Sequence, residues 1–256
     1  MKPENRYPFN TEKMEPIGRG EGMTELYELR KDPNKIIREI FVSKEDLNRM
    51  IGYIECHRTL LDDLSQNYGI VAPKTSFVVG EAGVGSPRIF LVTDKVDGSV
   101  LNENLDKAER KDAAFLKSST EDIIISLADY LKDKISAGED FMGDIFRIDQ
   151  YMYGSTNGSK KKNVYLVDLE TFLNQNQGEG GGKDSDYDYR TDACAAELID
   201  FIYVMERKTG RKFTEARKKV GELIEYFRET GQEFGGHTKE VADKFYDERK
   251  GSAQKR

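Results

Sequence analysis

The chain has 256 residues, of which 34% are charged and 37% hydrophobic, and its formal net charge is −7 at pH 7. This length suits one large domain or two small lobes, and either arrangement can bury a hydrophobic core. The negative charge argues against a broad nucleic-acid interface, which needs clustered Lys and Arg side chains. We therefore expect no nucleic-acid partner.

The cysteine and histidine patterns predict neither a disulfide framework nor a structural zinc site. Cys56 and Cys194 lie far apart without a C-x-x-C motif, and His57 and His237 do not have zinc-ligand spacing. The first 16 residues contain no apolar segment, and no stretch approaches the ~18 apolar residues of a membrane span. We expect a cytoplasmic protein with no membrane partner.

A glycine-rich turn between strands is the first motif. Gly18, Gly20 and Gly22 occupy alternate positions between two strand-like stretches. Glycine lets backbone N–H groups approach a phosphate closely. The three glycines alone are consistent with a nucleotide-binding loop or with an ordinary turn. Strands are expected at 24–29 and 35–41, separated by a turn.

The strand at 35–41 carries a candidate phosphate-binding cation, Arg38. Alternation along a strand places Arg38 on the same face as the isoleucines two residues to either side. A helix is expected over 43–67, with Ser43 as N-cap and apolar residues at helical spacing. Glu55 lies near the middle of this helix.

The central part of the chain predicts a hairpin and a long helix. The hairpin strands are expected at 75–79 and 88–93, before a break at 94–98. A helix is expected over 118–135, with its N-terminal cap in the sequence 119–122. Beyond residue 170, a polar loop is expected at 174–189 and amphipathic helices at about 189–210, 214–229 and 238–249.

Three acidic residues, Asp144, Asp149 and Asp168, stand at expected loop and strand ends. The apolar runs 150–154 and 163–168, joined by an Asn-Gly turn signal, predict a hairpin. This hairpin would return Asp168 to the loop that carries the other two acids. Three converging carboxylates can hold one divalent cation and one hydroxyl group, as phosphoryl transfer requires.

These motifs resemble those of the protein kinase-like superfamily, especially its aminoglycoside-phosphotransferase-like branch. The family's loop H-G-D-x-x-x-x-N matches Met142-Gly143-Asp144 and Asp149. Its D-F-G or I-D-F-E motif matches the sequence Val-Asp-Leu-Glu at 167–170. Met142 stands where the family has His, and Asp149 where it has Asn. Carboxylate oxygen is as good a Mg²⁺ ligand as amide oxygen.

The resemblance implies an α+β, two-lobed protein kinase-like fold with ATP and Mg²⁺ as cofactors. Residues 1–95 would form the N-lobe, with an antiparallel sheet and one helix, and residues 96–256 a mainly helical C-lobe. Asp144 would orient the substrate hydroxyl and accept its proton, while Asp149 and Asp168 would hold Mg²⁺.

The resemblance also implies a nucleotide site. The glycine loop and Arg38 would contact the phosphates, with Arg38 in place of the family's lysine and held by Glu55. Backbone groups from Asp94 to Val96 would meet the adenine edge.

Three functions remain open from the sequence. The first is an ATP-dependent phosphotransferase acting on a hydroxyl of a protein or a small molecule. The second is an inactive pseudokinase, a nucleotide-binding interaction module, which the missing Lys and His favour. The third, a carboxylate-based metal hydrolase, leaves the glycine loop and Arg38 without a role. The Gly143-Asp144 pair points toward small-molecule kinases and the polar loop after Glu170 toward protein kinases, so the acceptor stays open.

Overall fold

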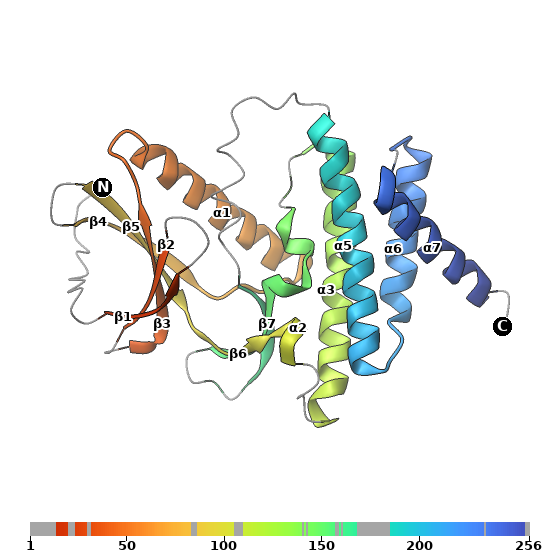
Figure 1. Ribbon diagram of the computed structural model, residues 1–256, viewed down its shortest axis with the longest axis horizontal. Coiled ribbons are helices and arrows are strands. Elements are labelled where there is room, and N and C mark those ends of the chain that lie inside the picture. Colours follow the sequence, from red (N-terminus) through yellow and green to blue (C-terminus); the bar gives the residue numbers. More distant parts are fainter. Residues whose placement is uncertain are drawn as a thin grey trace.

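The protein is an α+β structure with two antiparallel sheets, as the sequence predicted. Figure 1 shows the larger sheet at one end, the long helices at the other, and the smaller sheet between them. The computed structural model describes residues 14–19, 24–29, 32–82, 86–104, 110–139, 141, 143–156, 159, 161–167, 185–232 and 234–253.

The larger sheet has five strands in the order β1-β2-β3-β5-β4, and every neighbouring pair is antiparallel. The strands expected from the sequence in this region are confirmed. β3 begins at Asp32, inside the expected turn, because Leu29 pairs with Asp32 across an irregularity in β2. The strands are β1 (Met14–Arg19), β2 (Thr24–Leu29), β3 (Asp32–Phe41), β4 (Thr75–Ala82) and β5 (Ser86–Asp94).

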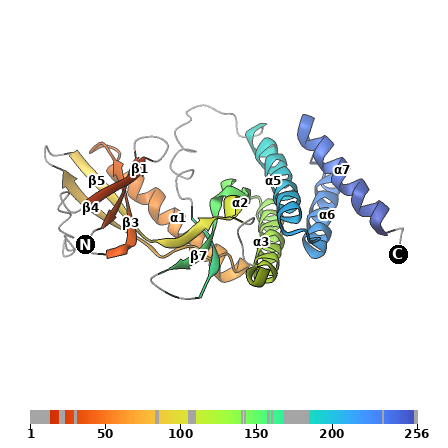
Figure 2. The ribbon, with the colours of Figure 1, turned by 60° about the horizontal axis from the view of Figure 1, so that its bottom comes forward.

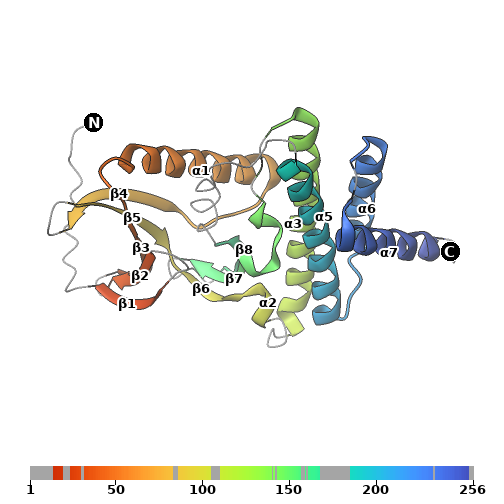
Figure 3. The same ribbon diagram turned by 45° about the horizontal axis from the view of Figure 1, so that its top comes forward.

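Helix α1 (Leu47–Tyr68) packs against two hydrophobic cores. Its first half lies along the five-stranded sheet (Figure 3), where Ile54 joins a cluster with Ile40. Its second half reaches the helical part of the protein, where Leu64 is fully buried. The Tyr68 hydroxyl donates a hydrogen bond to the Asp133 carboxylate at 3.0 Å. The helix is therefore anchored at both ends.

Helix α1 starts later than the sequence suggested. The expected N-cap, Ser43, accepts a hydrogen bond from the Asp46 N–H at 3.1 Å, but within a turn that precedes the helix. The helix begins at Leu47, and Gly69 ends it in the left-handed conformation with φ 67°. The expected boundary at Ser43 is therefore wrong by one turn, although its hydroxyl makes the predicted kind of contact.

The smaller sheet has three antiparallel strands in the order β6-β7-β8. The β7–β8 hairpin was expected, whereas the break expected at 94–98 is wrong, since β6 starts at its third residue. Local sequence does not reveal β6 because its partner β7 lies more than 50 residues away in the chain. The strands are β6 (Val96–Val100), β7 (Tyr151–Thr156) and β8 (Asn163–Leu166).

Two glycines let β6 and β7 approach closely. Gly98 and Gly154 face each other in register. A Cβ atom on Gly154 would lie 2.5 Å from the Asp97 carbonyl oxygen, and one on Gly98 would lie 2.2 Å from the Tyr153 carbonyl oxygen. Both obstacles are backbone atoms, which cannot rotate away. Side chains at these positions would force the two strands apart.

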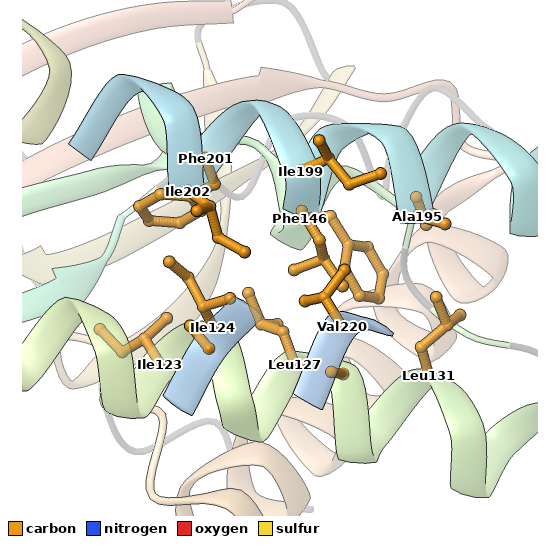
Figure 4. Close-up of a cluster of buried hydrophobic side chains, with 14 of the residues drawn as sticks. Ile123, Ile124, Leu127, Leu131, Phe146, Ala195, Ile199, Phe201, Ile202 and Val220 are labelled. Atoms are coloured by element: carbon orange, nitrogen blue, oxygen red, sulfur yellow. The ribbon is translucent and has the colours of Figure 1, made fainter. Parts of the chain in front are cut away.

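Helices α3, α5 and α6 lie side by side and enclose the larger hydrophobic core (Figures 1 and 2). Figure 4 shows part of this core, where Ile124 and Leu127 of α3 meet Ile199 of α5 and Phe146. Within the described part of the chain, no helix combines the length and apolar character needed to cross a membrane. The helices are α2 (Leu101–Asn104), α3 (Arg110–Ala137), α5 (Ser185–Thr209), α6 (Thr214–Glu229) and α7 (Gly236–Ala253).

Three of these helices begin earlier than expected, α7 by only two residues. α3 starts at Arg110 rather than 118, so the stretch 119–122 does not cap it. Thr120 of this stretch is fully buried and donates its hydroxyl to the Leu116 carbonyl inside the helix. A threonine can make this bond in a helix interior as well as cap a helix end. α5 starts at Ser185, within the stretch expected to be loop. The bounds of α6 agree with the prediction.

Glu206 of α5 connects this helix to α6 and to the segment before α6. Its carboxylate accepts hydrogen bonds from Arg217 Nη2 at 2.7 Å and Nε at 2.8 Å, from the Phe213 N–H at 3.0 Å and from Lys212 Nζ at 3.1 Å. Burial alone would raise its pKa, but these bonds outweigh burial and lower the pKa to about 2. The ionised form of Glu206 therefore stabilises the folded state.

We expect Gly154→Ala to lower the free energy of unfolding by about 1–3 kcal/mol, because its methyl group would collide with the backbone of β6. Urea unfolding followed by circular dichroism measures the change. Gly52→Ala is the matched control. Gly52 is exposed to solvent, lies away from the ends of α1 and has open space at its Cβ position. This control should be neutral or stabilising by up to about 1 kcal/mol. Equal stability of the two variants would contradict the close approach of β6 and β7.

Glu206→Gln should change how stability depends on pH. With a folded pKa near 2 and an ordinary value of 4.5, the carboxylate stabilises the fold fully above pH 4.5 and loses this effect as the pH falls toward 2. The variant lacks this titration, so its free energy of unfolding should be lower above pH 4.5 and fall less below it. Urea unfolding across this range tests the expectation, with the exposed Glu229→Gln as control.

Candidate functional site

The β7–β8 hairpin brings the two acid-bearing segments together. The N–H of Val167, just after β8, donates a hydrogen bond to the Gln150 carbonyl at 2.9 Å. Gln150 directly follows Asp149 in the chain, and Val167 directly precedes Asp168. Asp168 itself lies outside the described residues. The backbone on either side of this hydrogen bond nevertheless brings the two segments to adjacent positions, as the sequence predicted.

Asp144 begins a short 3-10 helix, η3 (Asp144–Phe146), at the edge of the helical core. The buried Tyr151 hydroxyl donates to the Ile145 carbonyl at 2.7 Å, and burial raises the pKa of this phenol far above its ordinary value. From α5, the Cys194 thiol lies 3.7 Å from the carbonyl oxygen of the residue before Asp144. These contacts fix the backbone around a half-buried carboxylate.

Asp149 lies in the next 3-10 helix, η4 (Ile148–Gln150). One of its carboxylate oxygens accepts a hydrogen bond from Arg147 Nη2 at 2.5 Å, and the other accepts one from Gln150 Nε2 at 3.2 Å. The side chains of Arg147 and Asp149 are 47% and 40% exposed. An ion pair this exposed contributes little stability, so other charged groups can compete for Asp149.

Glu197 of α5 adds a further carboxylate to this region. Its pKa is raised, first by burial and then by the negative charges of Asp200, Asp149 and Asp144. The positive charge of Arg147 works in the opposite direction. Although burial disfavours the charged guanidinium, the hydrogen bond to Asp149 and the surrounding acids raise the pKa of Arg147. The site is thus a set of acids around one arginine.

Sequence reasoning did not identify Arg147 or Glu197. Glu197 lies three residues after Cys194, so both side chains project from the same face of α5 toward the loop at 143–149. Nothing in the local sequence indicates that this face of α5 meets that loop. Arg147 had a detectable signal, since it is a cation placed two residues before a candidate metal ligand.

Arg38 lies on the face of the five-stranded sheet that α1 covers. It pairs in register with Leu91 of β5. Leu91 and Ile40 belong to the hydrophobic cluster that includes Ile54 of α1. Residues paired across neighbouring strands share a face of the sheet, so Arg38 faces α1, in agreement with the alternation seen in the sequence.

The residue of α1 that lies close to Arg38 is His57, not Glu55. His57 is 8% exposed, and its pKa is lowered to about 4, first by burial and then by the positive charge of Arg38. Glu55 is exposed and forms no ion pair with the described residues. Successive helical residues are ~100° apart around the axis, so Glu55 is turned outward from the buried Ile54. The predicted Arg38–Glu55 pair is therefore not formed.

The glycine loop is described only at its first residue. Gly18 lies in β1 opposite Leu26 of β2, just after an irregularity in the strand register. Gly20 and Gly22 lie outside the described residues. The phosphate-binding role of this loop stays a prediction.

The expected adenine-binding segment runs from the end of β5 into β6. The N–H of Asp94 donates to the Lys74 carbonyl at 3.0 Å, and the N–H of Lys95 donates to the Asn34 carbonyl at 2.7 Å. Val96 is the buried first residue of β6. Two of the amides expected to meet a base are thus already used within the protein, and any contact with a base would fall to the other backbone groups.

Two ion pairs connect this segment to the strands of the larger sheet. Lys35 Nζ pairs with the carboxylate of Asp94, which is 4% exposed. Lys95 Nζ pairs with Glu28 of β2. Lys35 therefore does not lie beside α1 with Arg38. Alternation along β3 predicted this difference, because it places the two side chains on opposite faces of the sheet.

The carboxylates of Asp144 and Asp149 have the hard oxygen donors that suit Mg²⁺, and they project from consecutive short helices. Among the described residues, no three His, Cys, Asp or Glu side chains form a group that could hold a metal ion. The third expected ligand, Asp168, is outside that part of the chain. The magnesium site stays a prediction. The carboxylates of Asp144 and Asp149 are suitable ligands for it.

Comparisons with protein-family models and with curated proteins found no match to the chain. Assignment to a family therefore depends on the motifs and the geometry described above.

We expect Glu197→Gln to raise the free energy of unfolding at pH 7. A raised folded pKa means that Glu197 costs no stability below its ordinary value of 4.5 but lowers stability as the pH rises through the folded pKa. The gain should therefore disappear below pH 4.5. Urea unfolding at both pH values tests this, with Asp122→Asn on the exposed face of α3 as control. A destabilising effect at pH 7 would contradict the electrostatic description.

Proposed function

We propose that the protein is a two-lobed, kinase-like phosphotransferase that transfers a phosphoryl group from Mg²⁺-bound ATP to a hydroxyl group of a protein or a small molecule. The observation that carries the proposal is the hydrogen bond between the Val167 N–H and the Gln150 carbonyl at 2.9 Å. It brings together the residues that adjoin Asp149 and Asp168 in the chain, and η3 sets Asp144 in the same loop as Asp149. Three carboxylates in this arrangement suit phosphoryl transfer.

In this proposal Asp144 orients the substrate hydroxyl and accepts its proton. Its backbone is fixed by the buried Tyr151 hydroxyl and by α5, and such fixation favours a group that must hold one geometry. Asp149 and Asp168 would hold Mg²⁺, which neutralises charge on the phosphates. Every step assigned to the protein is thus positioning or proton transfer.

The five-stranded sheet and α1 support the N-lobe of the proposal. Helix α1 lies between β3 and β4 in the order of the chain, and Arg38 of β3 faces this helix. A guanidinium can bind phosphate oxygens in a two-pronged fork, whereas lysine acts as a point charge. The larger sheet ends at Asp94 and the smaller one begins at Val96, which agrees with lobes of 1–95 and 96–256.

A second candidate is an inactive kinase-like module that binds nucleotide and a partner protein. The observation that favours it is the Arg147–Asp149 contact at 2.5 Å, because the guanidinium occupies the carboxylate expected to bind metal. Arg38 in place of lysine points in the same direction. The two candidates share nucleotide binding and differ in turnover.

We expect saturating Mg²⁺·ATP to raise the melting temperature of the protein. Ligand at 100 times its dissociation constant stabilises the folded state by about 2.7 kcal/mol. Differential scanning fluorimetry with Mg²⁺·ATP, Mg²⁺ alone and ATP alone measures the effect. The absence of any shift at millimolar nucleotide would contradict both candidates.

Asp144→Asn separates the two candidates, since it retains the shape of the side chain but cannot accept a proton. For an active phosphotransferase, the rate of phosphate transfer from labelled ATP should fall by about 10²–10⁴-fold, with the Mg²⁺·ATP melting shift retained. Acceptors to screen are the protein itself, protein mixtures and small hydroxy metabolites. A parent protein that binds Mg²⁺·ATP but transfers no phosphate to any of them would favour the inactive module.

A further inference from the structure

We propose that His57 is the residue of α1 that positions Arg38 for the nucleotide phosphates, where the family resemblance implied the carboxylate of Glu55. This inference depends on the proposed function for the identity of the ligand. The interaction between the two side chains can be tested without any nucleotide. His57 is a positioning residue in this proposal, because it acts through Arg38.

Arg38 and His57 belong to the same interface between helix and sheet. Arg38 lies two residues before Ile40 on β3, and both are on the face of the sheet that α1 covers. His57 lies one helical turn after Ile54, which contacts the same cluster from α1. Since residues three apart share a helix face, His57 is on the side of α1 that faces the sheet, and Arg38 is on the side of the sheet that faces α1.

Helix α1 holds His57 in place. The helix packs on the sheet through Ile54 and on the helical core through Leu64, and His57 lies between these two contacts. The Tyr68 hydroxyl bond to Asp133 fixes the end of the helix. A buried side chain on a helix anchored at both ends has little freedom to move away from Arg38.

The charge states of His57 and Arg38 also suit a phosphate site. The pKa of His57 is lowered to about 4, first by burial and then by the positive charge of Arg38, so the ring is neutral at physiological pH. A neutral imidazole leaves the charge of the guanidinium in place, whereas a carboxylate would cancel it. This part of the site therefore favours an anion, and a phosphate group matches a guanidinium in charge and geometry.

The contact is tested by NMR titration of the imidazole protons. The chain has two histidines, His57 and His237, so the spectrum is simple to assign. In Arg38→Gln, the pKa of His57 should move from about 4 toward the ordinary value of 6.5. Arg58→Gln is the matched control, because it removes the same charge from an exposed position next to His57 and should leave the titration unchanged. An unchanged titration in Arg38→Gln would overturn the proposal.

The role is tested by nucleotide affinity. His57→Leu should raise the dissociation constant of Mg²⁺·ATP about tenfold, and His57→Gln, which retains a polar group, should raise it less. Affinity for adenosine, which lacks phosphates, should not change in either variant. Glu55→Gln should bind Mg²⁺·ATP like the parent. Weaker ATP binding in Glu55→Gln with normal binding in both His57 variants would show that the family arrangement holds and overturn the proposal.

The titration and the affinity measurements together distinguish failure of the proposed function from failure of the His57 proposal. A parent protein that binds no Mg²⁺·ATP would overturn the proposed function, and with it the phosphate role of His57. The titration would then still decide whether Arg38 and His57 interact. Normal ATP binding in every variant, combined with the expected titration shift, would show a structural contact without a positioning role and would also overturn the proposal.

Discussion

Helix α1 joins two of the hydrophobic clusters, one beside the five-stranded sheet and one among the helices, and the arrangement of the candidate site depends on this packing. Its first half covers the sheet face that carries Arg38, and its second half is buried against α3. The chain that leaves α1 continues the connection, since the Val71 carbonyl accepts the Leu166 N–H of β8 at 2.8 Å. One residue further, Val167 bonds to Gln150 in the acid-bearing loop. Helix α1 and these two backbone hydrogen bonds thus connect the sheet that carries Arg38 to the loop that carries Asp144 and Asp149.

Charged groups have two different roles in this protein. In the helical core, Glu206 is almost enclosed and receives several donors from α6 and the segment before it, so its charge supports folding. At the candidate site, Asp149 and Arg147 are exposed to solvent and add little to stability. Groups that contribute little to folding can change partners when a ligand binds. This contrast agrees with the assignment of a ligand role to the exposed loop.

Local patterns identified the elements whose partners are close in the chain. The β7–β8 hairpin was predictable because a turn signal joins two short β-rich runs, and α6 because its apolar stripe and boundaries are both clear. Strand β6 was missed because its hydrogen-bond partner is distant in sequence. The start of α3 was missed because Thr120 can cap a helix or bond inside one, and only burial decides between these uses.

The sequence by itself determined the α+β class, the side of β3 on which Arg38 lies, and the return of the chain beside Asp149, because alternation and turn chemistry act over a few residues. Only the tertiary structure decided which residue of α1 lies near Arg38. The apolar stripe of α1 leaves a gap between Ile54 and Leu60, and the buried position in this gap is filled by His57. Glu55 has the carboxylate expected to pair with Arg38, but its side chain is exposed and turned away from the sheet. The angle at which a helix packs on a sheet depends on both cores, so it determines which side chain is enclosed, and no local pattern contains that information.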